Sequence, residues 1–109
     1  LMKMGALTTA GSYAGAGFVH ILIDNGAYES TGGQCTSSIV VDWKKLFQSV
    51  GYKDIILIEN QAKLSQIKLS SLKSPAAIIV KVVPGSRKDL GRPTTTPVQN
   101  RDAFTAFVK

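Results

Sequence analysis

Three short runs of apolar residues constrain the fold more than any other feature of this sequence. They span residues 18–23, 54–58 and 76–83, and each is rich in Ile or Val without a clean alternation of apolar and polar positions. Strands that are buried on both faces of a parallel sheet have this pattern. Because helical patterns lie between the runs, the sequence predicts an α/β fold with a mainly parallel sheet, in a three-layer α/β/α arrangement.

The helical patterns are of unequal quality. The clearest begins at Trp43, with Asp42 as N-cap and Gly51 as terminator. Residues 61–73 are rich in helix formers and predict a second helix. A last helix is expected with Asn100 as its cap, and it would bring together Phe104, Phe107 and Val108.

The start of the chain predicts a helix whose small residues suit close packing. Leu1, Met2, Met4 and Leu7 lie in an apolar helical stretch with neither a cap nor a preceding strand. A three-stranded parallel sheet would also leave its edges uncovered. We therefore expect the natural protein to continue upstream, with residues 1–109 forming a single domain.

Composition limits the location and the partners. The single cysteine, Cys35, allows no internal disulfide and suits a reducing compartment. No signal peptide and no long apolar run is visible, so we expect a cytoplasmic protein without a membrane partner. The net charge is +6, and residues 41–109 carry +7 because residues 1–40 hold one lysine and two acids. Without basic stripes interleaved with aromatics or DNA-binding motifs, we expect no nucleic-acid partner.

The segment that follows the first apolar run is the most informative for function. Asp24 and Asn25 stand where a strand of the sheet is expected to end, and open parallel sheets bind ligands beyond the carboxyl ends of their strands. Oxygen donors there suit Mg²⁺ or Ca²⁺, and the glycines that follow allow close approach to a bulky anion. Asp-Asn-Gly is also an ordinary turn signal, and these three residues alone favour that interpretation.

The longer string favours a ligand site over an ordinary turn. Residues 24–34, Asp-Asn-Gly-Ala-Tyr-Glu-Ser-Thr-Gly-Gly-Gln, resemble the second half of the thiamine diphosphate motif, whose first half is Gly-Asp-Gly. With Met-Lys-Met-Gly-Ala-Leu-Thr-Thr at residues 2–9 and Arg-Lys-Asp-Leu-Gly-Arg-Pro-Thr-Thr-Thr-Pro at residues 87–97, the sequence resembles the phosphonopyruvate decarboxylase family. Sulfopyruvate decarboxylases come second. The resemblance covers nearly the whole chain and implies a carboxyl-terminal part of the diphosphate-binding domain.

Two parts of the family pattern are absent from the chain. The resemblance places Gly-Asp-Gly, with its metal-binding aspartate, just upstream of Leu1. The pyrimidine-binding domain, whose glutamate activates the cofactor, is also missing. We therefore expect the chain alone to be inactive and the complete protein to be a homo-oligomer of at least two subunits.

The resemblance implies how the loop would hold thiamine diphosphate and Mg²⁺. The metal ligands would be the side-chain oxygen of Asn25 and the backbone carbonyl of Ala27. Asp24 would orient the loop around the cofactor rather than bind the metal. Gly26 and Tyr28 would line the diphosphate site.

The remaining loop residues are implied to serve the reaction. Glu29 would be the catalytic group, and Ser30 and Thr31 would face the thiazolium and the substrate. The implied substrate is an anionic 2-oxoacid, 3-phosphonopyruvate, decarboxylated to phosphonoacetaldehyde. An anionic substrate needs cationic partners. The candidates are Arg87, Lys88 and Arg92. They are explained equally well as solvated charges of a surface loop.

Three alternatives stay open at this point. The substrate could be sulfopyruvate, because the motifs do not separate the two families. The chain could be a subunit of a split enzyme, although the absent Gly-Asp-Gly weighs against an intact subunit. It could also be a stand-alone α/β binding module whose turn only resembles the cofactor motif.

Overall fold

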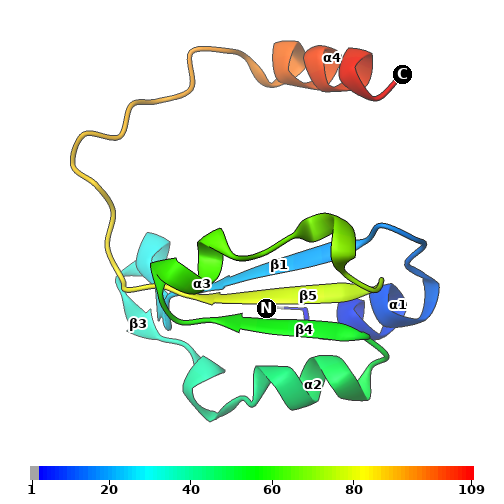
Figure 1. Ribbon diagram of the computed structural model, residues 1–109. Coiled ribbons are helices and arrows are strands. Elements are labelled where there is room, and N and C mark those ends of the chain that lie inside the picture. Colours follow the sequence, from blue (N-terminus) through cyan, green and yellow to red (C-terminus); the bar gives the residue numbers. More distant parts are fainter. Residues whose placement is uncertain (1–2) are drawn as a thin grey trace.

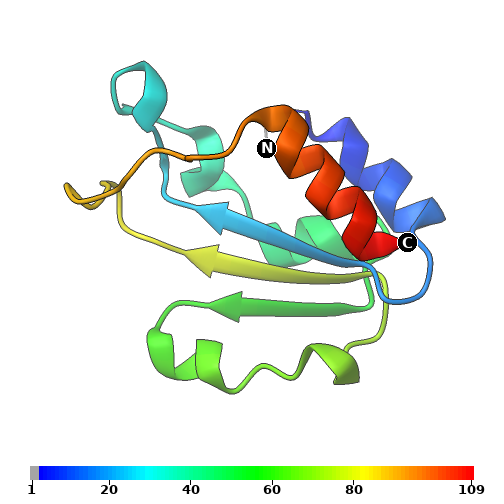
Figure 2. The same cartoon turned by 90° about the horizontal axis from the view of Figure 1, so that it is seen from above.

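The three predicted strands form one parallel sheet. The computed structural model describes residues 3–109, so Leu1 and Met2, which we expected in the first helix, lie outside the described residues. The strands are β1 (Val19–Asp24), β4 (Asp54–Ile58) and β5 (Ala76–Lys81), in the order β1-β5-β4 (Figure 1). Figure 2 shows them side by side, with β5 between the two edge strands. The third strand ends two residues earlier than the apolar run had indicated.

Helices flank this sheet, as an α/β chain requires. Two helices, α1 (Gly5–Tyr13) and α2 (Trp43–Ser49), pack against one face, and α3 (Gln61–Ser65) lies along β4 on the other (Figures 1 and 2). The core lies on the side of α1 and α2. It consists of Leu7, Leu22, Trp43, Phe47, Tyr52, Ala77 and Ile79.

The opposite face is covered unevenly, which corrects one expectation. The central strand is buried on both faces, since Ala76, Ala77, Ile78 and Ile79 are all at most 3% exposed. In β1, however, Ile21 is 57% and Ile23 is 68% exposed. The apolar run identified β1 as a strand, but within the described chain only one of its faces is packed.

Helix α2 has the ends that its sequence predicts. Asp42 accepts a hydrogen bond from the Lys45 amide at 3.1 Å, which satisfies a free N–H of the first turn. Gly51 follows the helix with φ of +95°, the left-handed conformation in which helices commonly end.

Two helical predictions are wrong in extent. The segment 61–73 forms only α3 and a 3-10 turn at Leu69–Ser71. The hydroxyls of Ser65 and Ser71 donate to carbonyls three residues back, at 2.9 Å and 2.8 Å, and such local bonds compete with a continuous helix. None of residues 61–73 is buried, and only Ile67 and Leu72 are half-buried, so packing does not compensate.

The last helix also begins earlier than predicted. Helix α4 (Pro97–Val108) is capped by Thr96 in a capping box with Gln99, and Pro97 occupies its first turn. Asn100 therefore lies inside the helix rather than at its cap, because proline is well suited to the first helical position.

The carboxyl-terminal arm stands away from the sheet (Figure 1). Every residue from Lys81 to Lys109 is exposed, including Phe104 at 65% and Phe107 at 85%. The arm thus leaves the sheet at the carboxyl end of β5 and adds nothing to the described core. Among residues 3–109, no helix is long and apolar enough to cross a membrane.

Candidate functional site

The loop between β1 and α2 begins at the carboxyl end of the sheet and folds into a small hairpin. Its two short strands are β2 (Ala27–Tyr28) and β3 (Gln34–Cys35), joined through a 3-10 turn at Glu29–Thr31. The Thr36 amide donates to the Gly26 carbonyl at 2.9 Å and closes the base of the hairpin. The sequence did not predict these strands, since two-residue strands leave no periodic pattern.

Asp24 is the buried polar anchor of this loop. One carboxylate oxygen, Oδ2, accepts from Lys81 Nζ at 2.5 Å and from Trp43 Nε1 at 3.0 Å. The other, Oδ1, accepts from the Gly26 amide at 3.1 Å. Asp24 is only 8% exposed, and both of its carboxylate oxygens accept hydrogen bonds from protein donors.

The electrostatics follow from these contacts. Burial by itself raises the pKa of the Asp24 carboxyl, but hydrogen bonds from Lys81, the Ser38 hydroxyl, the Gly26 amide and Trp43 outweigh burial and lower the pKa to about 2. Asp24 is therefore ionised throughout the neutral range. Its carboxylate has no proton to give at neutral pH.

Asn25 and Glu29 are brought together above this anchor. Asn25 Oδ1 accepts from the Ala27 amide at 3.1 Å, and Asn25 Nδ2 donates to Glu29 Oε2 at 2.6 Å. The other Glu29 oxygen accepts from the Gly85 amide. Glu29 thus joins the loop to the first residues of the carboxyl-terminal arm.

The other expected residues occupy the exposed hairpin. Tyr28 is 42% exposed, and Ser30 and Thr31 lie in the exposed 3-10 turn. Thr31 Oγ1 donates to the Tyr28 carbonyl at 3.3 Å, a contact within the turn. The structure thus separates the predicted residues into a buried anchor, a half-buried segment at 25–27 and an exposed tip.

The three cationic candidates of the arm are not brought to the loop. Arg87 Nε pairs with Asp89 at 3.4 Å, and both side chains are exposed. Among the hydrogen bonds and ion pairs of residues 3–109, none joins Arg87, Lys88 or Arg92 to residues 24–35. The cation that does reach the loop is Lys81, which the sequence interpretation missed.

Two hollows flank the loop. One, of about 490 Å³, is lined by residues of β1, the loop and α2 that include Asp24, Asn25, Ala27 and Trp43. A second, of about 290 Å³, shares Asp24 and Asn25 but extends towards Lys81. Segment 24–27 thus borders open space on two sides, as a ligand site at a strand end requires.

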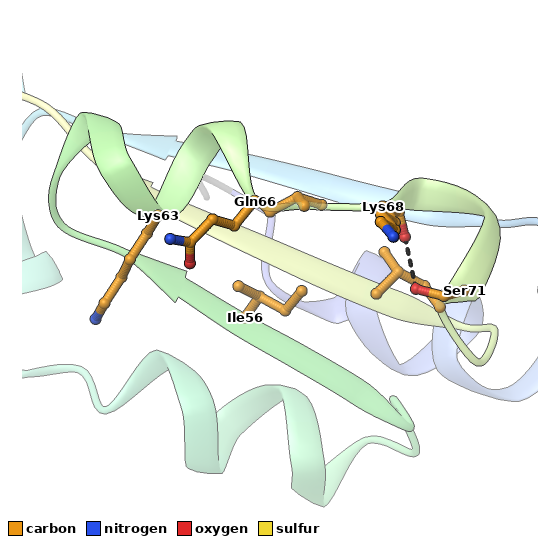
Figure 3. A pocket seen from close by; sticks show the side chains of 7 residues that line it. Ile56, Lys63, Gln66, Lys68 and Ser71 are labelled. Atoms are coloured by element: carbon orange, nitrogen blue, oxygen red, sulfur yellow. Dashed lines mark hydrogen bonds between the residues drawn. The ribbon is translucent and has the colours of Figure 1, made fainter.

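A separate cavity of about 320 Å³ lies beside α3 (Figure 3). Its lining includes Ile56, Lys63, Gln66 and Lys68, and the Ser71 hydroxyl donates to the Lys68 carbonyl at 2.8 Å. It contains no carboxylate, histidine or cysteine to pair with these lysines. We therefore place the candidate site at the loop and not in this cavity.

The oxygen donors at the loop fit a hard cation that keeps several non-protein ligands. The described residues contain no cluster of three or more His, Cys, Asp or Glu side chains. Three candidate oxygen ligands lie within five residues: Asn25 Oδ1 and the Ala27 carbonyl in the half-buried segment, and the exposed Glu29 carboxylate. Mg²⁺ is commonly held by one or two protein oxygens together with water and phosphate oxygens, so the donor set suits Mg²⁺ and does not suit a soft metal.

Comparison with known proteins gives the class first. No family model matches the chain. The chain is nevertheless homologous over nearly its whole length to phosphonopyruvate decarboxylases.

The relatives themselves are of two kinds. The chain is 36% identical over 110 residues to the phosphonopyruvate decarboxylase of Streptomyces viridochromogenes, an alignment that covers 99% of this chain and 28% of that protein. It is 33% identical over 109 residues to the phosphonopyruvate decarboxylase of Streptomyces hygroscopicus, covering 98% and 27%. It is 27% identical over 109 residues to sulfopyruvate decarboxylase subunit beta of Methanococcus maripaludis, covering 100% and 59%. The chain thus spans little more than a quarter of the two Streptomyces relatives.

Proposed function

We propose that this chain forms the carboxyl-terminal part of the diphosphate-binding domain in a three-layer thiamine diphosphate fold. We also propose that the full-length gene product decarboxylates 3-phosphonopyruvate to phosphonoacetaldehyde and CO₂. The observation that carries the proposal is the 36% identity to a phosphonopyruvate decarboxylase over 99% of the chain. A loop rich in oxygen donors at the carboxyl end of β1 supports it.

The metal ligands in this proposal are Asn25 and Ala27. Asn25 Oδ1 already points back over the segment, where it accepts from the Ala27 amide at 3.1 Å. An amide oxygen has a second lone pair for Mg²⁺ while it keeps this bond. Asp24 orients the segment through the Gly26 amide.

The cofactor and substrate contacts come from the rest of the hairpin. Gly26 has φ of +67°, so the chain reverses there without a side chain, and with Tyr28 it lines the diphosphate site. When bound, thiamine diphosphate supplies the electron sink for loss of CO₂. Glu29 is the catalytic candidate, with Ser30 and Thr31 beside it, as the family resemblance implies. Its carboxylate accepts from the amide nitrogen of Asn25, the proposed metal ligand, at 2.6 Å.

The proposal includes partners that this chain does not contain. A pyrimidine-binding domain and the Gly-Asp-Gly half of the metal motif complete the site, and the active form is a homo-oligomer. The partial coverage of the Streptomyces relatives, 28% and 27%, supports such additional parts. The chain by itself is expected to be inactive.

Sulfopyruvate is the second candidate substrate. All of this chain aligns with sulfopyruvate decarboxylase subunit beta, at the lower identity of 27%. Both substrates are anionic 2-oxoacids, so the loop chemistry serves either one. The higher identity to the two phosphonopyruvate decarboxylases favours phosphonopyruvate.

The test is a decarboxylation assay of the full-length gene product with thiamine diphosphate and Mg²⁺, comparing the two substrates. We expect turnover of 3-phosphonopyruvate, and a higher kcat/KM for it than for sulfopyruvate. Preferential turnover of sulfopyruvate would move the protein to the second class. Absence of turnover with both would contradict the proposal.

A variant pair tests the metal assignment. Asn25→Ala removes the proposed side-chain ligand, so we expect the Mg²⁺ and cofactor concentrations at half-maximal activity to rise about tenfold or more. The matched control is Asn100→Ala, because Asn100 lies in the exposed helix α4. If Asn25→Ala and Asn100→Ala required the same Mg²⁺ concentration, Asn25 would not be a ligand.

A further inference from the structure

The Asp24 carboxylate divides its hydrogen bonds between the scaffold and the loop. Oδ2 takes both scaffold donors, Lys81 Nζ at 2.5 Å and Trp43 Nε1 at 3.0 Å. Oδ1 takes the loop donor, the Gly26 amide at 3.1 Å. The carboxylate therefore transmits the position of two distant elements to the residues on either side of Gly26.

We infer that Lys81 and Trp43 are positioning residues for the candidate cofactor loop: they fix the Asp24 carboxylate, and through it the orientation of Asn25 and Ala27. This inference rests on the proposed function only for the identity of the ligand. The contacts themselves belong to the chain.

The two scaffold donors come from rigid parts of the fold. Lys81 is the last residue of the central strand and stands opposite Asp24 in the parallel register of β1 and β5. Trp43 begins α2, is 7% exposed and packs in the core cluster. Asp24 is therefore held from the neighbouring strand and from the helix beneath the sheet.

The loop side is fixed between two points. The Gly26 amide is bound to Asp24, and the Gly26 carbonyl accepts from the Thr36 amide at 2.9 Å. Asn25 and Ala27 flank this doubly bound residue. A change in the direction of the Asp24 carboxylate moves the Gly26 amide. The proposed metal-ligand oxygens of Asn25 and Ala27, on either side of Gly26, then move as well.

Substitution of Lys81 tests its positioning role without disturbing the folded core. Its side chain is 41% exposed and lies outside the core cluster, so its removal does not open the core. Lys81→Met keeps most of the aliphatic stem and removes the cation. Lys81→Arg restores a cation, and Lys63→Met is a matched control because Lys63 makes an exposed surface pair with Glu59.

The sequence supplies its own reporter. Trp43 is the one tryptophan among the 109 residues, and its indole N–H is bound to Asp24. Its fluorescence thus reports directly on the carboxylate. The experiment measures the binding of thiamine diphosphate plus Mg²⁺ to the full-length gene product. Trp fluorescence is used if Trp43 is its only tryptophan, and calorimetry if other tryptophans are present.

We expect Lys81→Met to raise the Kd for the thiamine diphosphate–Mg²⁺ pair about 10- to 100-fold, the usual cost of removing a group that orients metal ligands. Lys81→Arg should recover most of the affinity, and Lys63→Met should bind as the wild type does. Wild-type affinity in Lys81→Met would overturn the inference.

A second measurement needs no cofactor. In the cofactor-free protein, Lys81→Met should speed hydrogen exchange at the Gly26 and Ala27 amides and leave the core amides, such as Ile79, unchanged. If exchange rose throughout the sheet, Lys81 would be a stability residue and the positioning role would fail. If the wild type bound no thiamine diphosphate, the proposed function would fail, whereas the exchange pattern would still decide the positioning role.

Discussion

The low pKa of Asp24 makes the stability of the fold depend on acid in a predictable way. The carboxyl has a pKa of about 2 in the folded chain and 3.8 as its reference value. A difference of that size corresponds to about 2 kcal/mol of folding free energy in favour of the ionised form. Because the folded-state pKa is the lower one, this contribution is fully present above pH 5 and disappears as the pH falls through 2.

The variant Asp24→Asn removes this titration and keeps the shape of the side chain. It leaves Lys81 without its counter-ion and, at pH 7, costs about 2 kcal/mol or more because one of the two buried oxygens that accept from protein donors becomes an NH₂ group. The difference in unfolding free energy between wild type and Asp24→Asn should shrink as the pH falls from 5 to 2. Urea unfolding followed by circular dichroism at several pH values measures it.

Asp42→Asn is the matched control. Hydrogen bonds from the Lys45 amide and side chain lower the pKa of Asp42 as well, but this carboxyl is on the surface. We expect a smaller and more salt-sensitive pH dependence for it. An Asp24→Asn variant that followed the wild-type pH curve with a constant offset would refute the reasoning.

Two glycine substitutions follow from the backbone geometry. In α1, a Cβ on Gly11 would lie 1.7 Å from the Val50 carbonyl oxygen, so Gly11→Ala should destabilise the fold by about 2 kcal/mol or more. Gly5→Ala in the same helix meets nothing within 4 Å and should be neutral or stabilising by up to about 1 kcal/mol. Equal stability of these two variants in urea unfolding would show that α1 and the end of α2 are not in contact. Gly26→Ala has space but forces a left-handed φ of +67° on alanine, so we expect a loss of about 1 kcal/mol and faster exchange in the loop.

The exposed arm explains why some sequence patterns were informative only locally. Thr96, Pro97 and Gln99 are sufficient to begin α4, because a capping box and an N-terminal proline act within one turn. Whether Phe104 and Phe107 are buried depends on contacts outside the helix, and in the described chain they are exposed. Local signals therefore set the start of this helix, which the prediction with Asn100 as cap placed too late, and they did not determine its packing.

The sequence singled out the loop at residues 24–34, whose role as a cofactor site stays a prediction, but it did not indicate the long-range contacts that hold the loop. The expectation that Asp24 orients this loop stays a prediction, and the structure adds that its carboxylate accepts hydrogen bonds from Lys81, Trp43 and the Gly26 amide. Nothing local indicated Lys81, which lies 57 residues away. The available signal for Lys81 was its place at the end of a buried strand. Because the carboxyl ends of parallel strands lie at one edge of a sheet, such a lysine can reach a loop that begins there.

The sequence by itself determined the three strands, the bounds of α2 and the family of the loop, because apolar runs, caps and motifs act over a few neighbouring residues. The tertiary structure alone decided the strand order β1-β5-β4, which places Lys81 beside Asp24, and the packing of α2, which brings Trp43 to the same carboxylate. Strand order and register depend on which surfaces pack best across the whole chain. The low pKa of Asp24 and its role as the anchor of the loop follow from that packing.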